Sequence, residues 1–230
     1  MNLDQKEHCI NCANKSPLFK LLKPAELEII NKGRHEVIYN TGETIFKQGS
    51  PLSHVLSFNY GLAKIHLQGA ENKNIILRLV KPVEFVSGMG MFLDNRNQFS
   101  LTALEGSSVC FIDKENFKKV MQHNFVFTEA FIRHNQTFQS YNLKKLMNLN
   151  LKNAKGKIAD ALLYLSNEIY KSDSFTSHLS KSELAELSSI SKESAFKVLS
   201  EFENDGIITI TSNKIEIKDK RRLELISNNG

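Results

Sequence analysis

Residues 180–199 restrict the fold of this chain more than any other segment, because they have the pattern of two short helices joined by a tight turn. Ser180 and Glu183 have the spacing of a capping box, which predicts that a helix begins there. Ser191 stands as the N-cap of a second helix, and Glu193 lies in its first turn, where the helix dipole favours a carboxylate.

The second of these helices has an apolar face and a polar face. Helical spacing predicts that its buried residues are Ala195, Val198, Leu199 and Phe202. In a helix-turn-helix, the residues on the other side of such a helix meet base edges in the major groove. The candidates here are Ser191, Lys192, Glu193, Ser194, Phe196 and Lys197.

A hairpin pattern follows directly after the second helix. Asp205-Gly206 ends the helix, and residues 207–211 and 214–218 alternate as strands around Ser212-Asn213. This arrangement predicts a winged helix-turn-helix, in which Lys214 of the wing is placed to contact DNA phosphates.

The composition is typical of a globular protein that works in a reducing compartment. The chain has 230 residues, a formal net charge of +5 and three cysteines. Three cysteines argue against a disulfide framework and favour the cytoplasm, and the sequence contains no apolar run of transmembrane length. Residues 152–230 carry 12 basic and 12 acidic side chains. DNA affinity there must therefore come from local placement of charge rather than from net charge.

The first half of the chain has the texture of an antiparallel β domain. Short apolar runs separated by Gly- and Pro-containing turns fill residues 36–112, without alternating strands and helices. This spacing predicts a sandwich or barrel. The expected strands contain residues 37–39, 44–46, 55–58, 62–67, 75–80, 85–86, 101–104 and 109–112.

A long helix is predicted over residues 125–150, which contain no Gly or Pro. One stripe along this segment recurs at alternating steps of three and four residues, which is typical of a paired helix in a dimer. The alternative is that this stripe packs on the barrel of its own chain. The stripe consists of Phe131, His134, Phe138 and Tyr141.

Together these patterns predict an α+β chain. Residues 1–123 form an N-terminal tail and a jelly-roll (double-stranded β-helix) barrel, residues 124–151 a dimerisation helix, and residues 152–230 a winged helix-turn-helix. In this order and at these lengths the layout resembles the Crp/Fnr family of bacterial transcription regulators. Residues 191–199, Ser-Lys-Glu-Ser-Ala-Phe-Lys-Val-Leu, are similar to the family's recognition helix. Residues 153–159 and 108–112 are similar to the segment entering its DNA-binding domain and to its last barrel strand.

The resemblance implies a homodimer that binds an inverted-repeat operator, contacts RNA polymerase and activates or represses transcription. Glu193 would accept a hydrogen bond from a cytosine amino group, and Lys197 would reach guanine or a phosphate. The family usually has Arg where this chain has Lys197, so the bidentate fork is missing. Phe196 has two interpretations, a contact with a thymine methyl group or additional core packing.

The same resemblance argues against cyclic AMP as the effector. Relatives that bind it use a Glu for the ribose and an Arg for the cyclic phosphate, in a cassette matched here by residues 87–100. Met89 occupies the Glu position, and no Arg precedes Ser100 in the expected register. The nearest cation is Arg96.

The oxygen-sensing branch of the family holds an iron–sulfur cluster with four cysteines. This chain offers Cys9, Cys12 and Cys110, and Leu18 stands about where a third N-terminal cysteine would be. A fourth ligand would have to come from His8, Asp4 or Glu7. The alternative is an unused tail and a buried cysteine. In the metal-free chain we expect residues 1–12 to be mobile, or Cys9 and Cys12 to lie away from Cys110.

Two other classes of function are weighed against this one. A cupin-like enzyme would need clustered metal ligands, whereas His35, His54 and His66 are scattered along the chain. A ligand sensor or protein-interaction module with a vestigial helix-turn-helix is favoured only by the neutral C-terminal charge.

Overall fold

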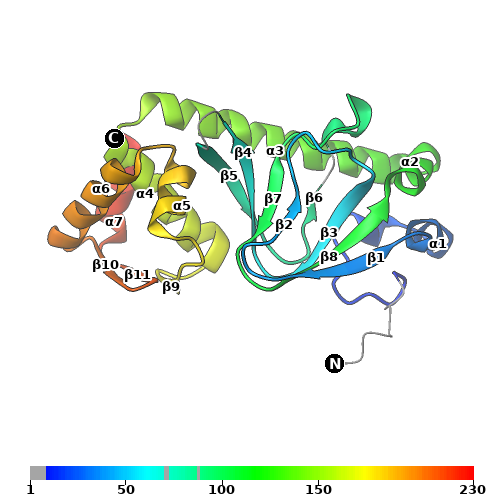
Figure 1. The fold of residues 1–230 in the computed structure, drawn as a ribbon, viewed down its shortest axis with the longest axis horizontal. Helices are drawn as coiled ribbons and strands as arrows, with labels where there is room; N and C mark the ends of the chain where they lie inside the picture. The colour runs from blue at the N-terminus through cyan, green and yellow to red at the C-terminus, as the bar shows by residue number, and fades with distance from the viewer. Residues whose placement is uncertain (1–8, 70–72, 87–88) are drawn as a thin grey trace. The chain divides into compact units, whose positions relative to one another are not determined.

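The computed structural model describes residues 9–69, 73–86 and 89–230, and these divide into two compact units. The first unit contains the described residues up to Ile65 together with Val80–Tyr141, and the second contains His66–Leu79 together with Asn142–Gly230. Figure 1 shows the strands and helices of each unit. None of the described helices is long and apolar enough to cross a membrane.

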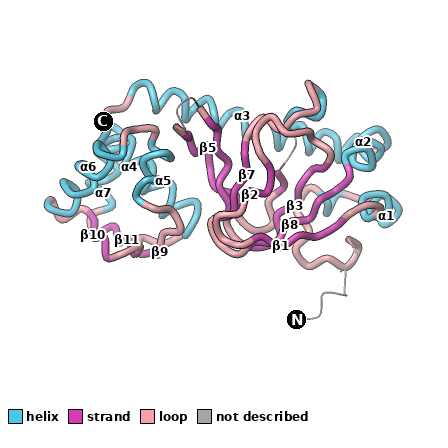
Figure 2. The backbone as a smooth tube through the Cα atoms, viewed as in Figure 1, coloured by secondary structure: helices cyan, strands magenta, loops and turns pink. Residues whose placement is uncertain are grey.

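Two four-stranded antiparallel sheets form the barrel, as Figure 2 shows in magenta. One sheet has the order β1-β8-β3-β6 and the other has the order β2-β7-β4-β5. All eight strands predicted from the sequence are confirmed, and so is the jelly-roll-like architecture. They are β1 (His35–Tyr39), β2 (Thr44–Phe46), β3 (His54–Tyr60), β4 (Ala63–Gln68), β5 (Asn74–Val80), β6 (Phe85–Val86), β7 (Ser100–Ala103) and β8 (Ser107–Asp113).

Strand β8 lies between β1 and β3, and its register fixes which side chains meet. Cys110 is paired with Glu36 of β1 on one side and with Ser57 of β3 on the other. Both neighbouring strands run antiparallel to β8, and Val109 and Ile112 of β8 are buried. Cys110 therefore lies in the middle of the sheet rather than at an edge.

A cluster of five phenylalanines forms the core beside the barrel, and we call it the phenylalanine cluster. Its members come from the 3₁₀-helix η1 (Phe19–Leu21), from β6, and from the helices α2 (Lys114–His123) and α3 (Phe125–Leu151). The rings meet mostly edge to face, with centroids 5.2–6.4 Å apart, which is the favourable geometry for aromatic pairs. They are Phe19, Phe85, Phe117, Phe127 and Phe131.

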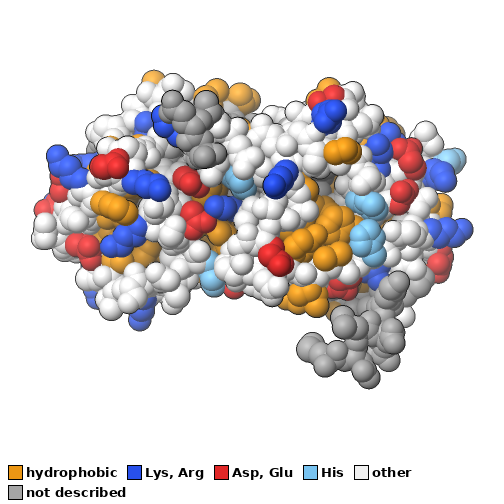
Figure 3. Space-filling view, viewed as in Figure 1, with side chains coloured by type: hydrophobic (Ala, Val, Ile, Leu, Met, Phe, Trp, Pro, Cys, Tyr) orange, Lys and Arg blue, Asp and Glu red, His pale blue; other side chains and the backbone are white. Residues whose placement is uncertain are grey.

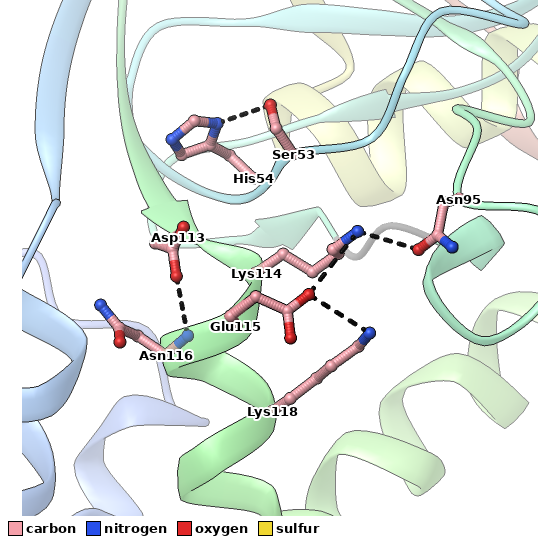
Figure 4. A network of polar contacts seen from close by, with 8 residues as sticks. All are labelled: Ser53, His54, Asn95, Asp113, Lys114, Glu115, Asn116 and Lys118. Atoms are coloured by element: carbon pink, nitrogen blue, oxygen red, sulfur yellow. Dashed lines mark hydrogen bonds and ion pairs between the residues drawn. The ribbon is translucent and has the colours of Figure 1, made fainter.

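The chain enters α2 through a capped junction at the end of β8, drawn in Figure 4. The carboxylate of Asp113 accepts a hydrogen bond from the backbone N–H of Asn116 at 2.8 Å, as an N-cap residue does. Lys114 donates to Asn95 at 2.9 Å. Glu115 lies 3.5 Å from Lys118 one turn further on. The helix α1 (Pro24–Asn31), which begins at Pro24, lies beside α2.

The long helix α3 confirms the prediction for residues 125–150, but the predicted stripe faces the barrel. Phe131 is 5% exposed and lies edge-on to Phe117 at 5.2 Å, and His134 lies 5.8 Å from the ring of Phe85. Phe138 lies 6.2 Å from the ring of Phe99. Phe131 is thus already buried within its own chain. The prediction that this stripe is buried against a second copy stays a prediction.

The second unit contains the winged helix-turn-helix. Its helices are α4 (Ala154–Tyr164), the π-helix η4 (Leu165–Tyr170), α5 (Lys181–Ser188), α6 (Lys192–Asn204) and α7 (Lys220–Asn229). A three-stranded sheet has the order β10-β11-β9 and consists of β9 (Ser174–Thr176), β10 (Ile208–Thr211) and β11 (Lys214–Ile217). The wing is the β10–β11 hairpin, in which Thr211 pairs with Lys214.

One carboxylate joins three helices of the second unit, and we call its surroundings the Asp160 network. Asp160 of α4 accepts hydrogen bonds from Asn148 at 2.9 Å and from Lys152 at 2.7 Å, near the end of α3. It also accepts one from the hydroxyl of Ser227 in α7. The network therefore fixes the turn from α3 into α4 against the last helix.

We expect Phe117→Ala to reduce the free energy of unfolding by about 3–5 kcal/mol, because it removes a fully buried ring from the phenylalanine cluster. Phe92→Ala is the matched control, since Phe92 is 63% exposed and its cation–π interaction with Lys118 is worth about 1 kcal/mol. Urea denaturation of the two variants measures the difference. Equal losses would contradict the assignment of the core to this cluster.

Candidate functional site

The helix-turn-helix consists of α5, a tight turn and α6, and its sequence signals are confirmed. Ser180 and Glu183 form the capping box at the start of α5. Ser189 adopts a left-handed conformation, with φ of 51°, and ends that helix. Ser191 accepts a hydrogen bond from the backbone N–H of Ser194 at 3.1 Å and so caps α6. These local features fix where α5 begins and ends and where α6 begins.

Helix α6 is buried on the predicted side and exposed on the other. Ala195, Val198, Leu199 and Phe202 are all buried, which confirms the predicted inner face. The outer face presents side chains that can donate hydrogen bonds, accept hydrogen bonds and make apolar contacts, as a base-reading surface requires. Its exposed residues are Lys192, Glu193, Phe196 and Lys197, with Ser194 partly exposed beside them.

Phe196 and Glu193 carry the most informative chemistry on this outer face. Phe196 is 44% exposed, so its interpretation as additional core packing is wrong. The pKa of Glu193 is lowered because its own backbone N–H and the Ser191 hydroxyl donate hydrogen bonds to its carboxylate. An ionised carboxylate accepts hydrogen bonds only, and this suits a base that presents an amino group.

Basic side chains near this surface are interspersed with acidic ones. Lys214 is exposed at the start of β11, whereas Lys218 forms an ion pair with Glu216 at 2.7 Å. Lys155 similarly forms an ion pair with Glu201 of α6 at 2.8 Å. Figure 3 shows blue and red side chains intermingled over the visible face of this unit. The electrostatic attraction to DNA must therefore come from individual lysines and helix N-termini.

A second site lies in the first unit, where the three cysteines line one pocket that we call the cysteine pocket. Cys9, Cys12 and Cys110 share it with Arg34 and Asn59. Of the two alternatives expected for the metal-free chain, a separation of Cys9 and Cys12 from Cys110 is therefore wrong, and mobility of residues 1–12 stays a prediction, since residues 1–8 lie outside the described part of the chain. The possible fourth ligands His8, Asp4 and Glu7 lie outside the described residues. Within the described ranges, no group of three or more His, Cys, Asp or Glu side chains is arranged to hold a metal ion.

Two polar side chains that the sequence did not indicate surround the sulfur of Cys110. The guanidinium Nη1 of Arg34 donates a hydrogen bond to it at 2.9 Å, and the amide of Asn59 donates another at 3.2 Å. Asn59 also donates to Glu36 of β1 at 2.9 Å. Burial raises the pKa of the Cys110 thiol, and the contacts with Asn59 and Arg34 oppose that rise.

The segment that matches the nucleotide cassette lacks a free phosphate-binding Arg in the described part of the chain. The guanidinium of Arg96 donates a hydrogen bond to the backbone carbonyl of Gly49 at 2.7 Å. Ser100 is buried, and its hydroxyl accepts from the backbone N–H of Gln48 at 2.9 Å. Ser87 and Gly88 lie outside the described residues. These contacts give Arg96 a structural role at the rim of the barrel.

Comparison with known proteins matches both units. The cyclic nucleotide-binding domain family matches residues 36–124, and the Crp-like helix-turn-helix domain family matches residues 156–226. The anaerobic regulatory protein of Bacillus subtilis is 23% identical, covering 88% of this chain and 91% of its own length. The transcriptional activator protein anr of Pseudomonas aeruginosa is 24% identical, covering 94% of this chain and 91% of its own length.

The fold is shared with solved structures as well. A putative Crp/Fnr-family transcriptional regulator from Eubacterium rectale aligns with a TM-score of 0.78 at 17% identity, covering 92% of this chain and 98% of that one. FixK2 from Bradyrhizobium japonicum aligns with a TM-score of 0.75 at 15% identity, covering 84% and 96%. The two matched families cover the barrel and the winged helix-turn-helix in chain order, and the chain belongs to the Crp/Fnr family of transcription regulators.

Proposed function

We propose that the chain is a homodimeric, sequence-specific regulator that binds double-stranded DNA with an inverted-repeat operator and acts with RNA polymerase in the cytoplasm. Its barrel responds to a small effector or a redox signal and repositions the recognition helices. The observation that carries this proposal is the outer face of α6, where Lys192, Glu193, Phe196 and Lys197 are exposed on a helix whose opposite face is buried.

The base-reading roles follow from the chemistry of that face. Glu193, ionised and at the N-terminus of α6, suits the amino group of cytosine, whereas Lys197 one turn later suits guanine or a phosphate. Phe196 lies between them in sequence and is exposed, so we assign it to a thymine methyl group. Ser191, Ser194 and Lys214 suit phosphate oxygens.

For the dimer we propose a face of α3 other than the stripe that packs on the barrel. Ile132, Leu143 and Leu146 are 52%, 67% and 58% exposed. With Gln136, Gln139 and Asn150 they recur at alternating steps of four and three, which is the spacing of a two-stranded coiled coil. We propose that the same face of α3 in a second copy of the chain packs against this face. An operator with two-fold symmetry requires such a second copy.

For the effector we propose a ligand or signal other than cyclic AMP. Binding a cyclic phosphate needs an accessible guanidinium, and the cation nearest the cassette, Arg96, already donates to Gly49. The chemically distinctive site of the barrel is instead the cysteine pocket, which contains three thiols and a guanidinium. A redox signal is therefore the class of input that we assign to this chain.

A ligand sensor with a vestigial helix-turn-helix is the second candidate, favoured by the equal numbers of basic and acidic residues in 152–230. A mobility-shift assay with an inverted-repeat site, titrated with salt, separates the two functions. A regulator binds the specific site in competition with random DNA, and its affinity falls as salt rises. Absence of specific binding in both oxidised and reduced protein would favour the second candidate.

We expect Glu193→Ala to relax base preference at one position of each half-site, with a loss of about 1–3 kcal/mol of discrimination there. Lys214→Ala should instead weaken binding to all sequences alike and reduce the salt slope by about 1, because it removes a phosphate contact. Competition binding to a library of half-site variants at several salt concentrations measures both effects. The same loss of specificity from both changes would contradict the assigned roles.

We expect Leu143→Glu to produce monomers that lose operator affinity, because it places one charge from each copy in the proposed coiled-coil face. Leu93→Glu is the matched control, since Leu93 is 77% exposed on the barrel and outside that face. Sedimentation equilibrium of the two variants measures the change. If Leu143→Glu sediments as the native protein does, the dimer interface lies elsewhere.

A further inference from the structure

The cysteine pocket does not fit the four-thiolate cluster that the oxygen-sensing branch implies. The chain has three cysteines in total, and the sulfur of Cys110 is already contacted by a cation, the guanidinium of Arg34, at 2.9 Å. A positive charge in hydrogen-bond contact with a sulfur disfavours a metal ion at the same sulfur. Burial raises the pKa of the Cys110 thiol, and the two donors that face its sulfur oppose that rise, so they favour the thiolate over what burial alone would allow.

The second thiol, Cys9, lines the same pocket as Arg34. The backbone N–H of Cys9 donates to the side chain of Asn31 at 3.4 Å, at the end of α1, and the Cys9 side chain packs against the apolar core. Burial raises the pKa of the Cys9 thiol, whereas the charge of Arg34 lowers it and the neighbouring Cys110 raises it. One guanidinium therefore acts on the sulfurs of both Cys9 and Cys110.

The pocket has room for a small oxidant beside these sulfurs. Its cavity of about 30 Å³ accommodates a molecule of about the size of water. Hydrogen peroxide is a small oxidant that converts thiols to sulfenic acids.

We propose that hydrogen peroxide oxidises Cys110 and that Cys9 resolves the product as a reversible disulfide, which is the redox input of the regulator proposed above. The Cys110 thiolate attacks one peroxide oxygen, the O–O bond breaks, and the leaving hydroxide is protonated to water. The Cys9 thiolate then attacks the sulfur of the sulfenic acid, an S–S bond forms, the S–O bond breaks, and a second water leaves. Two thiols and one peroxide thus yield one disulfide and two waters. Two molecules of an external thiol then reduce the disulfide to the two cysteines and are themselves oxidised to a disulfide.

This disulfide would join the N-terminal segment to the centre of the barrel sheet. Phe19 of that segment packs in the phenylalanine cluster against Phe127, 6.2 Å away at the start of α3. Fixing Cys9 to β8 therefore restrains Phe19 against the helix to which we assign the dimer contact. Oxidation and reduction of the pocket would act on the dimer through this aromatic contact.

The first test maps the bond in the full chain. Reduced protein is treated with hydrogen peroxide, free thiols are alkylated, and the tryptic peptides are fragmented in a mass spectrometer. Fragmentation is needed because no Lys or Arg separates Cys9 from Cys12. We expect a Cys9–Cys110 bond that reducing agent removes, retained in Cys12→Ser and lost in Cys9→Ser, where a sulfenic acid probe should label Cys110. A Cys9–Cys12 bond, a Cys12–Cys110 bond or a bond between two chains would overturn the proposal.

The second test concerns Arg34 and the reaction rate. The thiolate is the nucleophile, and the pKa of the Cys110 thiol lies above its ordinary value, so oxidation should accelerate as the pH rises towards that pKa. Arg34→Met should slow oxidation at least several-fold, whereas Arg34→Lys keeps the charge and should slow it less. Equal rates in native protein and Arg34→Met would exclude the role of the guanidinium.

The third test separates the redox input from the regulator itself. Operator affinity is compared between reduced and oxidised native protein, with Cys9→Ser as the matched control that cannot form the bond. We expect a change in affinity only in the native protein. Specific DNA binding that is the same in both states would overturn the redox input and leave the regulator intact. Disulfide formation without specific DNA binding in either state would contradict the proposed function instead.

Discussion

The packing of the phenylalanine cluster is the interaction on which the rest of the first unit depends. Five rings from the N-terminal segment, the barrel, α2 and α3 meet there, and neighbouring rings have centroids 5.2–6.4 Å apart. Rings packed this closely cannot move independently, because a shift of one leaves a void or a clash at the next. The cluster therefore couples the segment that carries Cys9 to α3, the helix on which we propose the dimer contact.

The parts of the fold that the sequence predicts are those set by residues close together in the chain, such as helix caps and turns. The ends of α5 and α6 follow from Ser180, Glu183, Ser191 and the pair Asp205-Gly206, because capping acts within a few residues. The eight barrel strands follow from short apolar runs between turns. The partner of the stripe on α3 did not follow from the sequence. A helical stripe of apolar residues indicates that a face is buried, but it does not indicate which surface covers that face. The sequence pattern does not indicate the exposed stripe through Ile132 and Leu143, because the polar residues Gln136 and Gln139 interrupt it.

The outer face of α6 and the cysteine pocket differ in how far apart their residues lie in the sequence, and therefore in how much of each site the sequence predicts. The residues of α6 to which we assign DNA contact lie within one run of nine residues, 191–199, so a short sequence pattern indicates them. The cysteine pocket is assembled from distant parts of the chain: Arg34 and Asn59 meet Cys110 across separations of 76 and 51 residues. Only the pairing of β8 with its neighbours and the position of the chain after α1 bring them together. Three cysteines could be recognised in advance, but not the donors that surround one of them.

The Asp160 network has a genetic consequence. Its hydroxyl donor, Ser227, belongs to the last helix, whereas its other donors, Asn148 and Lys152, adjoin the junction of α3 and α4. A nonsense mutation shortly before Ser227 would leave α3, with its proposed dimer face, and the recognition helix α6 intact. It would remove the contact of Ser227 with Asp160 and so free the junction of α3 and α4 from the last helix. Such a truncated subunit would still pair with full-length subunits and would misplace one of the two recognition helices. Late truncations in this gene should therefore be dominant over the wild-type allele, whereas early truncations should be recessive.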